Sequence, residues 1–305
     1  MYNFEYHNPK TVADAAKLVA GKDEAKLLAG GMTLIPTLKQ WLAKPSAVET
    51  GNLALYGDNG MPLVVKRADG TSGSTLGYSI RPGGTFLFQT AGSAENLAVG
   101  WVRVTPDAGT LSPAGAGIFS FSKQGILVTE SGIPAAELTT HARIYIDHTG
   151  NRGTGLAVAN PAASDITVMY KAYEKDGSTP AGDAGDPLIL QKNGHAAQFV
   201  SQMISGLPAE FSGVLDITSP SPFAALTMQS LTNTRGDFLL TTFPIADATL
   251  SAPAPLVFPQ IADGGGYLTR FVLLAAGAPA SVDLTFYGDD GAPLAVGSSK
   301  GVVKF

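Results

Sequence analysis

Apolar and polar residues alternate along many short stretches of this chain, and this period of two is typical of β-strands. Between Asp165 and Tyr173, apolar side chains occupy every second position, at Ile166, Val168 and Tyr170. A strand with this pattern presents one face to a core and the other face to solvent. Similar stretches follow one another from about residue 50 onward, separated by Gly, Pro, Asn and Asp, so we expect a mainly β fold.

One hairpin pattern occurs twice. Residues 53–65 and 284–296 are identical at eight of thirteen positions, and each has an apolar run, a Gly-Asp-Asn-Gly or Gly-Asp-Asp-Gly turn, and a second run that opens with Pro-Leu. A looser copy covers Tyr170–Gly177. The Asn-Gly and Asp-Gly pairs supply the positive φ angles that a tight turn between twisted strands requires. Such repetition indicates that the chain is built from similar units.

The most complete unit extends over residues 139–247. Its predicted strands are short, rich in apolar residues and separated by turn residues at roughly ten-residue spacing. They cover Arg143–Asp147, Gly155–Pro161, Asp165–Tyr173, Leu188–Leu190, Ala197–Val200, Gly213–Ile217, Phe223–Met228 and Phe238–Pro244. This arrangement predicts an immunoglobulin-like β-sandwich without the usual cysteine pair.

Residues 50–135 match only the later part of that unit. Tyr78–Gly84 matches Leu188–Gly194, and Gly100–Val104 matches Gly213–Ile217. Gly125–Glu130 matches the closing strand, whereas nothing before Leu53 corresponds to Arg143–Pro161.

Residues 255–305 match the opening part instead, through Phe258–Ala262, Thr269–Leu274 and the 284–296 hairpin. We therefore expect tandem immunoglobulin-like sandwiches, one complete and one split between residues 50–135 and 255–305. An incomplete sandwich exposes unpaired backbone groups and half a core, which is costly. Residues 255–305 could complete the split unit within one chain or in a neighbouring chain, or residues 1–48 could fill the gap.

Residues 1–48 have a different pattern. A short strand at Phe4–Tyr6 precedes a helix that Thr11 caps, and a second strand at Lys26–Ala29 precedes a helix that begins at about Leu34. This is a β-α-β-α segment.

Phe4–His7, Val12–Ala15 and Leu27–Lys39 resemble the beginning of the FAD-binding medium subunit of the carbon monoxide dehydrogenase and xanthine dehydrogenase family. The resemblance implies that the loop formed by Ala29, Gly30, Gly31, Met32, Thr33 and Leu34 wraps the FAD pyrophosphate. Two glycines let the backbone approach the ligand, and the following helix N-terminus offers free N–H groups to an anion. The family's second glycine-rich FAD loop has no counterpart, so the segment is either part of a flavin site or an α/β cap on the next domain.

Composition narrows the choice of partners. Only 15% of the 305 residues are charged and the net charge is −5, without a basic tract, so nucleic acid is not an expected partner. The absence of cysteine excludes disulfides, thiolate metal sites and cysteine nucleophiles. No apolar run approaches the ~20 residues that span a bilayer, and the longest, Phe271–Ala276, predicts a strand.

Location is predicted from a second resemblance. Phe258–Tyr267 and Gly100–Ala135 are similar to segments of uncharacterised, exported tandem-repeat β proteins of environmental bacteria. The resemblance implies an extracellular or cell-surface protein. The first residues lack the basic and apolar regions of a signal peptide, so a cytoplasmic location stays open.

Several residues could carry chemistry, and each has a simpler interpretation. Calcium could bind the acidic residues of the turns, but their spacing is not that of a calcium loop, and Asp before Gly is ordinary turn chemistry. These residues are Asp58, Asn59, Asp183, Asp186, Asp289 and Asp290. The three histidines of the β region lack metal-ligand spacing and are expected at the surface or in turns: His141, His148 and His195.

Three further candidates are equally open to a structural interpretation. Ser74 does not lie in a Gly-x-Ser-x-Gly elbow, so a hydrolase triad has no support. Trp101 alternates with Val102 and Val104, which favours core packing over stacking on a sugar. Gly264–Gly266 could cradle a phosphate, but no helix follows, so a loop is expected.

The sequence favours a non-enzymatic, extracellular structural or adhesive protein that self-associates head to tail by strand donation. An FAD-binding protein related to the medium subunits of molybdenum hydroxylases is the alternative, and a carbohydrate-binding module is a third. We expect neither metal nor catalytic residues, and no cofactor unless FAD binds. The identity of a glycan or protein ligand is not indicated.

Overall fold

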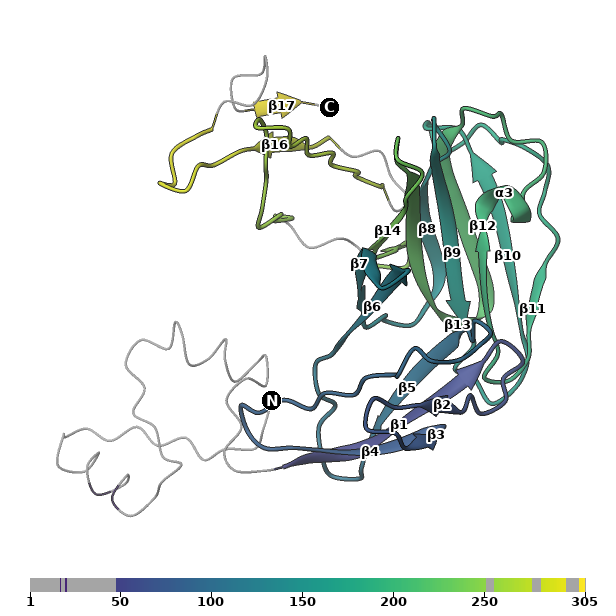
Figure 1. The fold of residues 1–305 in the computed structure, drawn as a ribbon. Coiled ribbons are helices and arrows are strands. Elements are labelled where there is room, and N and C mark those ends of the chain that lie inside the picture. The colour runs from purple at the N-terminus through teal and green to yellow at the C-terminus, as the bar shows by residue number, and fades with distance from the viewer. Residues whose placement is uncertain are drawn as a thin grey trace. The chain divides into compact units, whose positions relative to one another are not determined.

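The computed structural model describes residues 48–250, 255–275, 281–294 and 302–304, together with Lys17 and Ala20. In these residues the protein is mainly β, as predicted, and its sheets are antiparallel (Figure 1). The predicted α/β segment, including Ala29–Leu34, lies outside the described residues. The chain forms two compact units: one contains Leu63–Leu97 and Val102–Pro113, and the other contains Tyr56–Pro62, Ala98–Trp101 and the chain from Ala114 onward.

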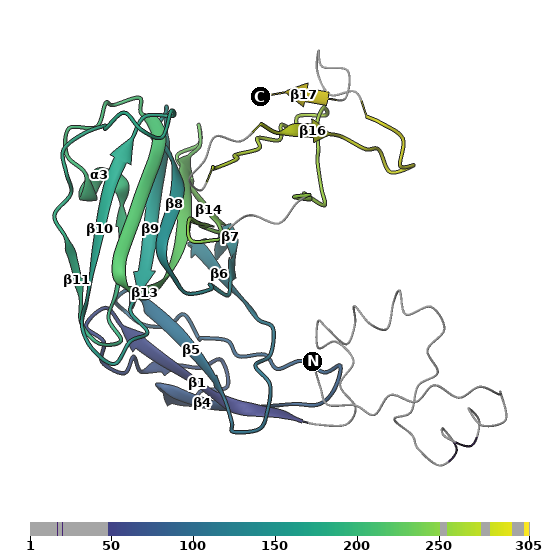
Figure 2. The ribbon, with the colours of Figure 1, turned by 180° about the vertical axis from the view of Figure 1, so that it is seen from behind.

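An eight-stranded antiparallel sheet, here called the central sheet, extends from Thr139 to Asp247. Its strands are β8 (Thr139–Asp147), β9 (Arg152–Ala159), β10 (Ile166–Tyr173), β11 (Leu188–Leu190), β12 (His195–Phe199), β13 (Ser212–Thr232), β14 (Phe238–Phe243) and β15 (Ala246–Asp247). A single helical turn, α3 (Val200–Met203), follows β12. Figure 2 shows β8, β9, β10 and β13 side by side from behind.

The 21-residue strand β13 curls this sheet. Its first half pairs with β10 and β8, and its second half pairs with β9 and β14. The sequence predicted two strands here, at Gly213–Ile217 and Phe223–Met228; both stretches are strand, and the structure joins them into one. The register shifts between Thr218 and Phe223, so the backbone bends without leaving the ladder, as a β-bulge allows.

The two halves of the curled sheet face each other across one hydrophobic core. The predicted alternation in β10 is confirmed: Ile166, Val168 and Tyr170 are buried, and the residues between them are exposed. The fully buried side chains from the other strands include Ile144, Ile146, Leu156, Val158, Leu215, Ile217 and Phe223. The curled sheet with a shared core agrees with the coarse architecture predicted for residues 139–247.

The chain before the central sheet forms three smaller sheets. Their strands are β1 (Glu49–Gly57), β2 (Val65–Lys66), β3 (Ser72–Gly73), β4 (Thr75–Ile80), β5 (Gly100–Pro106), β6 (Ala116–Lys123) and β7 (Ile126–Pro134). They pair in the order β4-β1-β5, and as the hairpins β2-β3 and β6-β7.

The three predicted hairpin turns share one backbone hydrogen bond, from a glycine amide to the carbonyl three residues before it. In the first turn the amide of Gly60 donates to the carbonyl of Gly57 at 2.9 Å, and Gly60 has a φ of 72°. In the last turn Gly291 donates to Gly288 at 2.9 Å, with a φ of 75°. Gly177 repeats this geometry in the middle turn. The hairpin predictions are confirmed at all three places.

The expected strands at Phe258–Ala262 and Thr269–Leu274 are not formed. Within residues 255–275 the described structure contains only an isolated bridge between Gly264 and Tyr267. Farther on, β16 (Asp283–Thr285) and β17 (Val302–Lys304) form a two-stranded sheet. A strand requires a partner that accepts and donates its backbone hydrogen bonds, and alternation alone does not supply one.

Candidate strand-accepting site

Strand β5 is an edge strand. It pairs with β1 on one side, and within the described residues no strand pairs with its other side. The unpaired N–H and C=O groups of an edge strand are a template for another strand. This edge of β5 is the candidate functional site.

The sheet that contains β5 has the same register as part of the central sheet. Glu49 lies opposite Ile80 in the β1–β4 pair, and Ile166 lies opposite Leu190 in the β10–β11 pair. Two residues farther along, Gly51 faces Tyr78 just as Val168 faces Leu188. Strands β1 and β4 therefore correspond to β10 and β11.

A close backbone contact extends this correspondence to β5. A Cβ atom added to Gly100 would overlap the carbonyl oxygen of Tyr56, and a Cβ added to Gly213 would overlap the carbonyl oxygen of Tyr173. Tyr56 is the last residue but one of β1 and Tyr173 is the last residue of β10, and each of these strands precedes an equivalent turn. Strand β5 therefore corresponds to the first half of β13, and each of its residues has a counterpart there.

The counterparts differ sharply in burial. Leu215 and Ile217 in β13 are 0% exposed, whereas Val102 and Val104 in β5 are 47% and 43% exposed. In the central sheet β8 pairs with this part of β13, with Leu215 opposite Ile144 and Ile217 opposite Ala142, and these side chains share one core with Leu156 and Val158 of β9. The edge of β5 thus presents apolar side chains that a neighbouring strand would bury.

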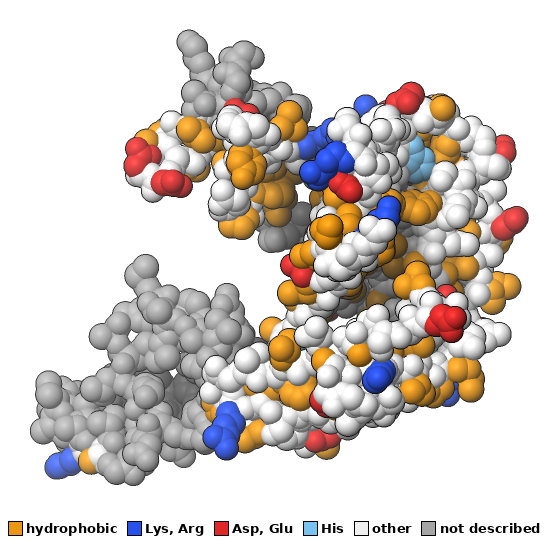
Figure 3. Space-filling view, in the orientation of Figure 1, with side chains coloured by type: hydrophobic (Ala, Val, Ile, Leu, Met, Phe, Trp, Pro, Cys, Tyr) orange, Lys and Arg blue, Asp and Glu red, His pale blue; other side chains and the backbone are white. Residues whose placement is uncertain are grey.

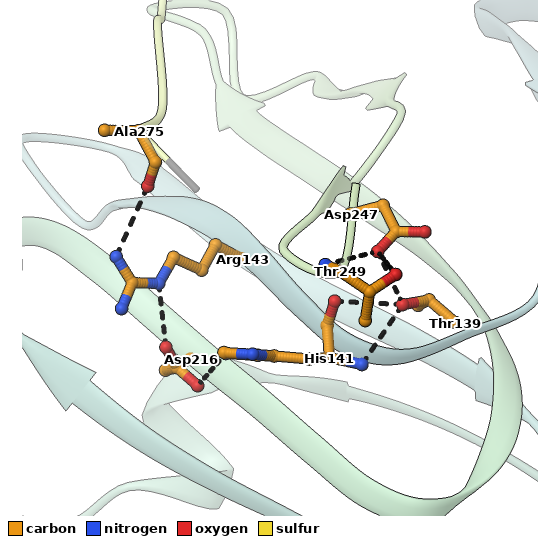
Figure 4. Close-up of polar contacts among 7 residues, drawn as sticks. All are labelled: Thr139, His141, Arg143, Asp216, Asp247, Thr249 and Ala275. Atoms are coloured by element: carbon orange, nitrogen blue, oxygen red, sulfur yellow. Dashed lines mark hydrogen bonds and ion pairs between the residues drawn. The ribbon is translucent and has the colours of Figure 1, made fainter. Parts of the chain in front are cut away.

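Polar contacts also join β8 to β13 (Figure 4). Asp216 accepts a hydrogen bond from Nε of Arg143 at 2.8 Å, and its other carboxylate oxygen lies 2.8 Å from Nε2 of His141. Thr139, on the same strand, donates to Asp247 at 2.9 Å. At the position of Asp216, β5 has a basic residue, Arg103. An added strand would therefore meet a different charge at β5 from the one that β8 meets.

The end of β8 carries a buried carboxylate. Asp147 is 1% exposed, lies 2.6 Å from Nη1 of Arg270, and accepts hydrogen bonds from the amide and hydroxyl of Thr149. Burial alone would raise the pKa of Asp147, but the bonds from Thr149 and Arg270 outweigh burial and hold this pKa below its ordinary value. Burial lowers the pKa of the neighbouring His148.

The β6–β7 hairpin is open in a similar way. The matching β13–β14 hairpin is flanked by β9, whereas β6 pairs only with β7 in the described part of the chain. Apolar side chains of this hairpin are exposed, among them Ile118 at 71% and Ile126 at 70%. Figure 3 shows hydrophobic side chains scattered over this face of the molecule.

The first hairpin turn docks on the turn between β11 and β12. His195 is 7% exposed, and its Nδ1 lies 2.8 Å from Oδ1 of Asp58. Trp101 stacks on Tyr56 with ring centroids 5.3 Å apart and donates its indole N–H to the carbonyl of Asn193 at 2.8 Å. The surface position predicted for His195 is wrong, because a turn distant in sequence covers it. The stacking of Trp101 on Tyr56 agrees with the packing role that was predicted for this side chain.

Replacing Gly60 with alanine is expected to lower the free energy of unfolding by about 1–3 kcal/mol. The new Cβ would overlap the carbonyl oxygen of Lys192. Gly70→Ala is the matched control, because Gly70 also has a positive φ, 87°, but has no atom within 4 Å of the added Cβ. Urea denaturation of the two variants checks the expectation, and an equal loss in both would contradict the role of the contact.

The other candidate residues have structural roles where the structure describes them. Asn59 and Asp290 each accept the amide two residues ahead, at 3.0 and 2.9 Å, which confirms turn chemistry. Asp183 accepts the hydroxyl of Ser205 at 2.9 Å. Among the described residues no group of three or more His, Asp or Glu could hold a metal ion, and His141, His148 and His195 are not brought together.

Comparison with protein-family models, curated proteins and solved structures finds no match to this chain. No described helix has the length and hydropathy that crossing a membrane would require.

Proposed function

We propose that this protein is a non-enzymatic structural or adhesive protein of repeated β-sandwich units, which self-associates by adding a strand at the edge of β5. The observation that carries the proposal is the contrast between Val102 and Val104, which are exposed, and Leu215 and Ile217, which are buried at corresponding positions. The shared register of the two sheets and the three equivalent hairpin turns support a repeated unit. An extracellular or cell-surface location suits such a protein and follows from the sequence resemblance.

Strand addition suits this site physically. Main-chain hydrogen bonds give an added strand its affinity, and alternate side chains enter the core and give specificity. Val102 and Val104 alternate along β5 in this way. The same edge would be costly to leave open in a stable monomer, because long apolar edges promote association.

No described contact favours the two alternative functions. The indole N–H of Trp101 is bonded to Asn193 and its ring stacks on Tyr56, so this side chain does not favour a sugar platform. The flavin hypothesis depends on Ala29–Leu34 and stays a prediction.

Lysine at both Val102 and Val104 is expected to abolish self-association without unfolding the protein. Both side chains are already partly exposed, so the substitutions cost little in the free chain, whereas burial of two charges under an added strand is unfavourable. Size-exclusion chromatography with light scattering, across a wide range of protein concentrations, measures the oligomeric state. Val64→Lys is the control, because Val64 is 65% exposed but lies outside β5. A wild-type protein that is monomeric at every concentration would overturn the proposal.

A further inference from the structure

We propose that the strand added to β5 is Phe258–Ala262 of a second copy of this chain, and that Thr269–Leu274 of the same donor forms the strand that follows it. This inference rests on the proposed self-association and names its donor. Three features carry it: the residue pattern of the donor, its exposed state in the free chain, and the unit to which it belongs.

The donor segment has the residue pattern of β8 and β9. Aligned without a gap, Val257, Pro259 and Ile261 fall at the positions of Ala142, Ile144 and Ile146, which point into the core of the central sheet. The second donor stretch places Thr269, Phe271 and Leu273 at the positions of Thr154, Leu156 and Val158, which are also buried. The donor segment therefore carries inward-facing residues like those of β8 and β9. Strands β5 and β6 have no such neighbours in the described part of the chain.

To be donated, the donor segment has to give up two polar contacts of the free chain, Arg270 with Asp147 and Arg143 with the carbonyl of Ala275. It contains no strand, although its sequence predicts two. Its apolar side chains are widely exposed, and they include Leu256 at 57%, Val257 at 72%, Phe258 at 42% and Leu268 at 80%. An apolar segment without a ladder gains both backbone hydrogen bonds and buried area when it joins an open edge.

A second copy is the better acceptor than the donor's own chain. The donor segment lies in the same compact unit as the central sheet. Within its own unit the segment is held by the bond between Arg270 and Asp147 at 2.6 Å and by Arg143, which donates to the carbonyl of Ala275 at 3.3 Å. The matching place beside β13 is already occupied by β8.

The correspondence fixes the register of the added strand. Because Ile217 faces Ala142 and Asp216 faces Arg143, Val104 is expected to face Val257, and Arg103 to face Phe258. Pro259 then faces Val102. At the end of β8 the N–H of His148 bonds to the carbonyl of Phe211, so by alternation the N–H at the Ile144 position also points toward β13. Pro259 therefore lacks one ladder bond to β5, a local cost that the other positions of the added strand must offset.

Single cysteines test this register, because the chain has none of its own. A mixture of Val104→Cys and Val257→Cys proteins is expected to form a disulfide-linked heterodimer under mild oxidation. Facing residues of antiparallel strands have Cα atoms about 4.5–5.5 Å apart, within the range that a disulfide spans. Val64→Cys mixed with Val257→Cys is the control for random oxidation, and it is expected to give at least tenfold less heterodimer.

Two results would overturn the donor assignment. One is a double variant, Val104→Cys with Val257→Cys, that cross-links within single chains and gives no covalent dimer, since this shows closure within one chain. The other is a wild-type protein that assembles, and loses assembly with lysine at Val102 and Val104, while the cysteine mixture gives no more dimer than its control. In that second case the proposed function stands and only the donor is wrong, whereas a strictly monomeric wild type removes both.

Competition by a peptide gives an independent readout. A synthetic peptide of residues 256–275 is expected to lower the mass of wild-type assemblies in light scattering, and a peptide of the same composition in scrambled order is expected to leave the mass unchanged. Equal effects of the two peptides would count against the assignment.

Discussion

Replacing Phe223 with alanine is expected to lower the free energy of unfolding by about 3–5 kcal/mol, the largest effect of any substitution considered for this chain. Phe223 is 0% exposed and belongs to the core cluster of the central sheet. It also lies where β13 resumes its pairing after the register shift. A cavity there removes packing from both halves of the curled sheet.

Chemical denaturation followed by tryptophan fluorescence or circular dichroism measures this loss. Phe238→Ala is the matched control, because Phe238 lies on the adjacent strand β14 and is 42% exposed. We expect the control to lose less than about 1.5 kcal/mol, in proportion to its smaller buried area. Similar losses in the two variants would show that Phe223 is not at the centre of the core.

Replacing Asp216 with alanine is expected to cost about 3 kcal/mol of stability. Its side chain is 14% exposed and accepts bonds from Arg143 and His141. Removing one partner of a largely buried ion pair leaves the other groups without their acceptor, and that penalty exceeds the net value of the pair itself.

Asp237→Ala separates this effect from simple loss of a carboxylate. Asp237 pairs with Arg235 at 3.0 Å, but the arginine side chain is 81% exposed, and surface pairs contribute only about 0–1 kcal/mol. Urea denaturation of both variants is the measurement. A loss at Asp216 no larger than the loss at Asp237 would contradict the structural role of the β8–β13 contact.

Much of the fold follows from local pattern. The alternation of Ile166, Val168 and Tyr170 predicted which face of β10 is buried, and Asp-Gly and Asn-Gly pairs predicted the hairpin turns. Predictions from the local pattern failed where the structure depends on which strands pair with one another. The pattern predicted the two stretches of β13 as separate strands, whereas the structure joins them through a register shift between Thr218 and Phe223. It also predicted strands in Phe258–Leu274, where no partner is present.

The candidate site was predictable only by comparison within the chain. Matching Gly100–Val104 to Gly213–Ile217 identified the strand that lacks a neighbour, and the exposure of Val102 and Val104 agrees with that expectation. The burial of His195 was not predictable in this way. Asp58, which contacts His195, is distant from it in sequence, and no local sequence signal identifies such a contact.

The continuous strand β13 has a mechanical consequence. One stretch of backbone belongs to both faces of the fold, so tension applied along it loads the ladders with β8 and β10 and the ladders with β9 and β14 at once. The two faces are therefore mechanically coupled through one strand. A protein that bears load between cells or surfaces would gain from such a strand, because a load on one face is then shared with the other.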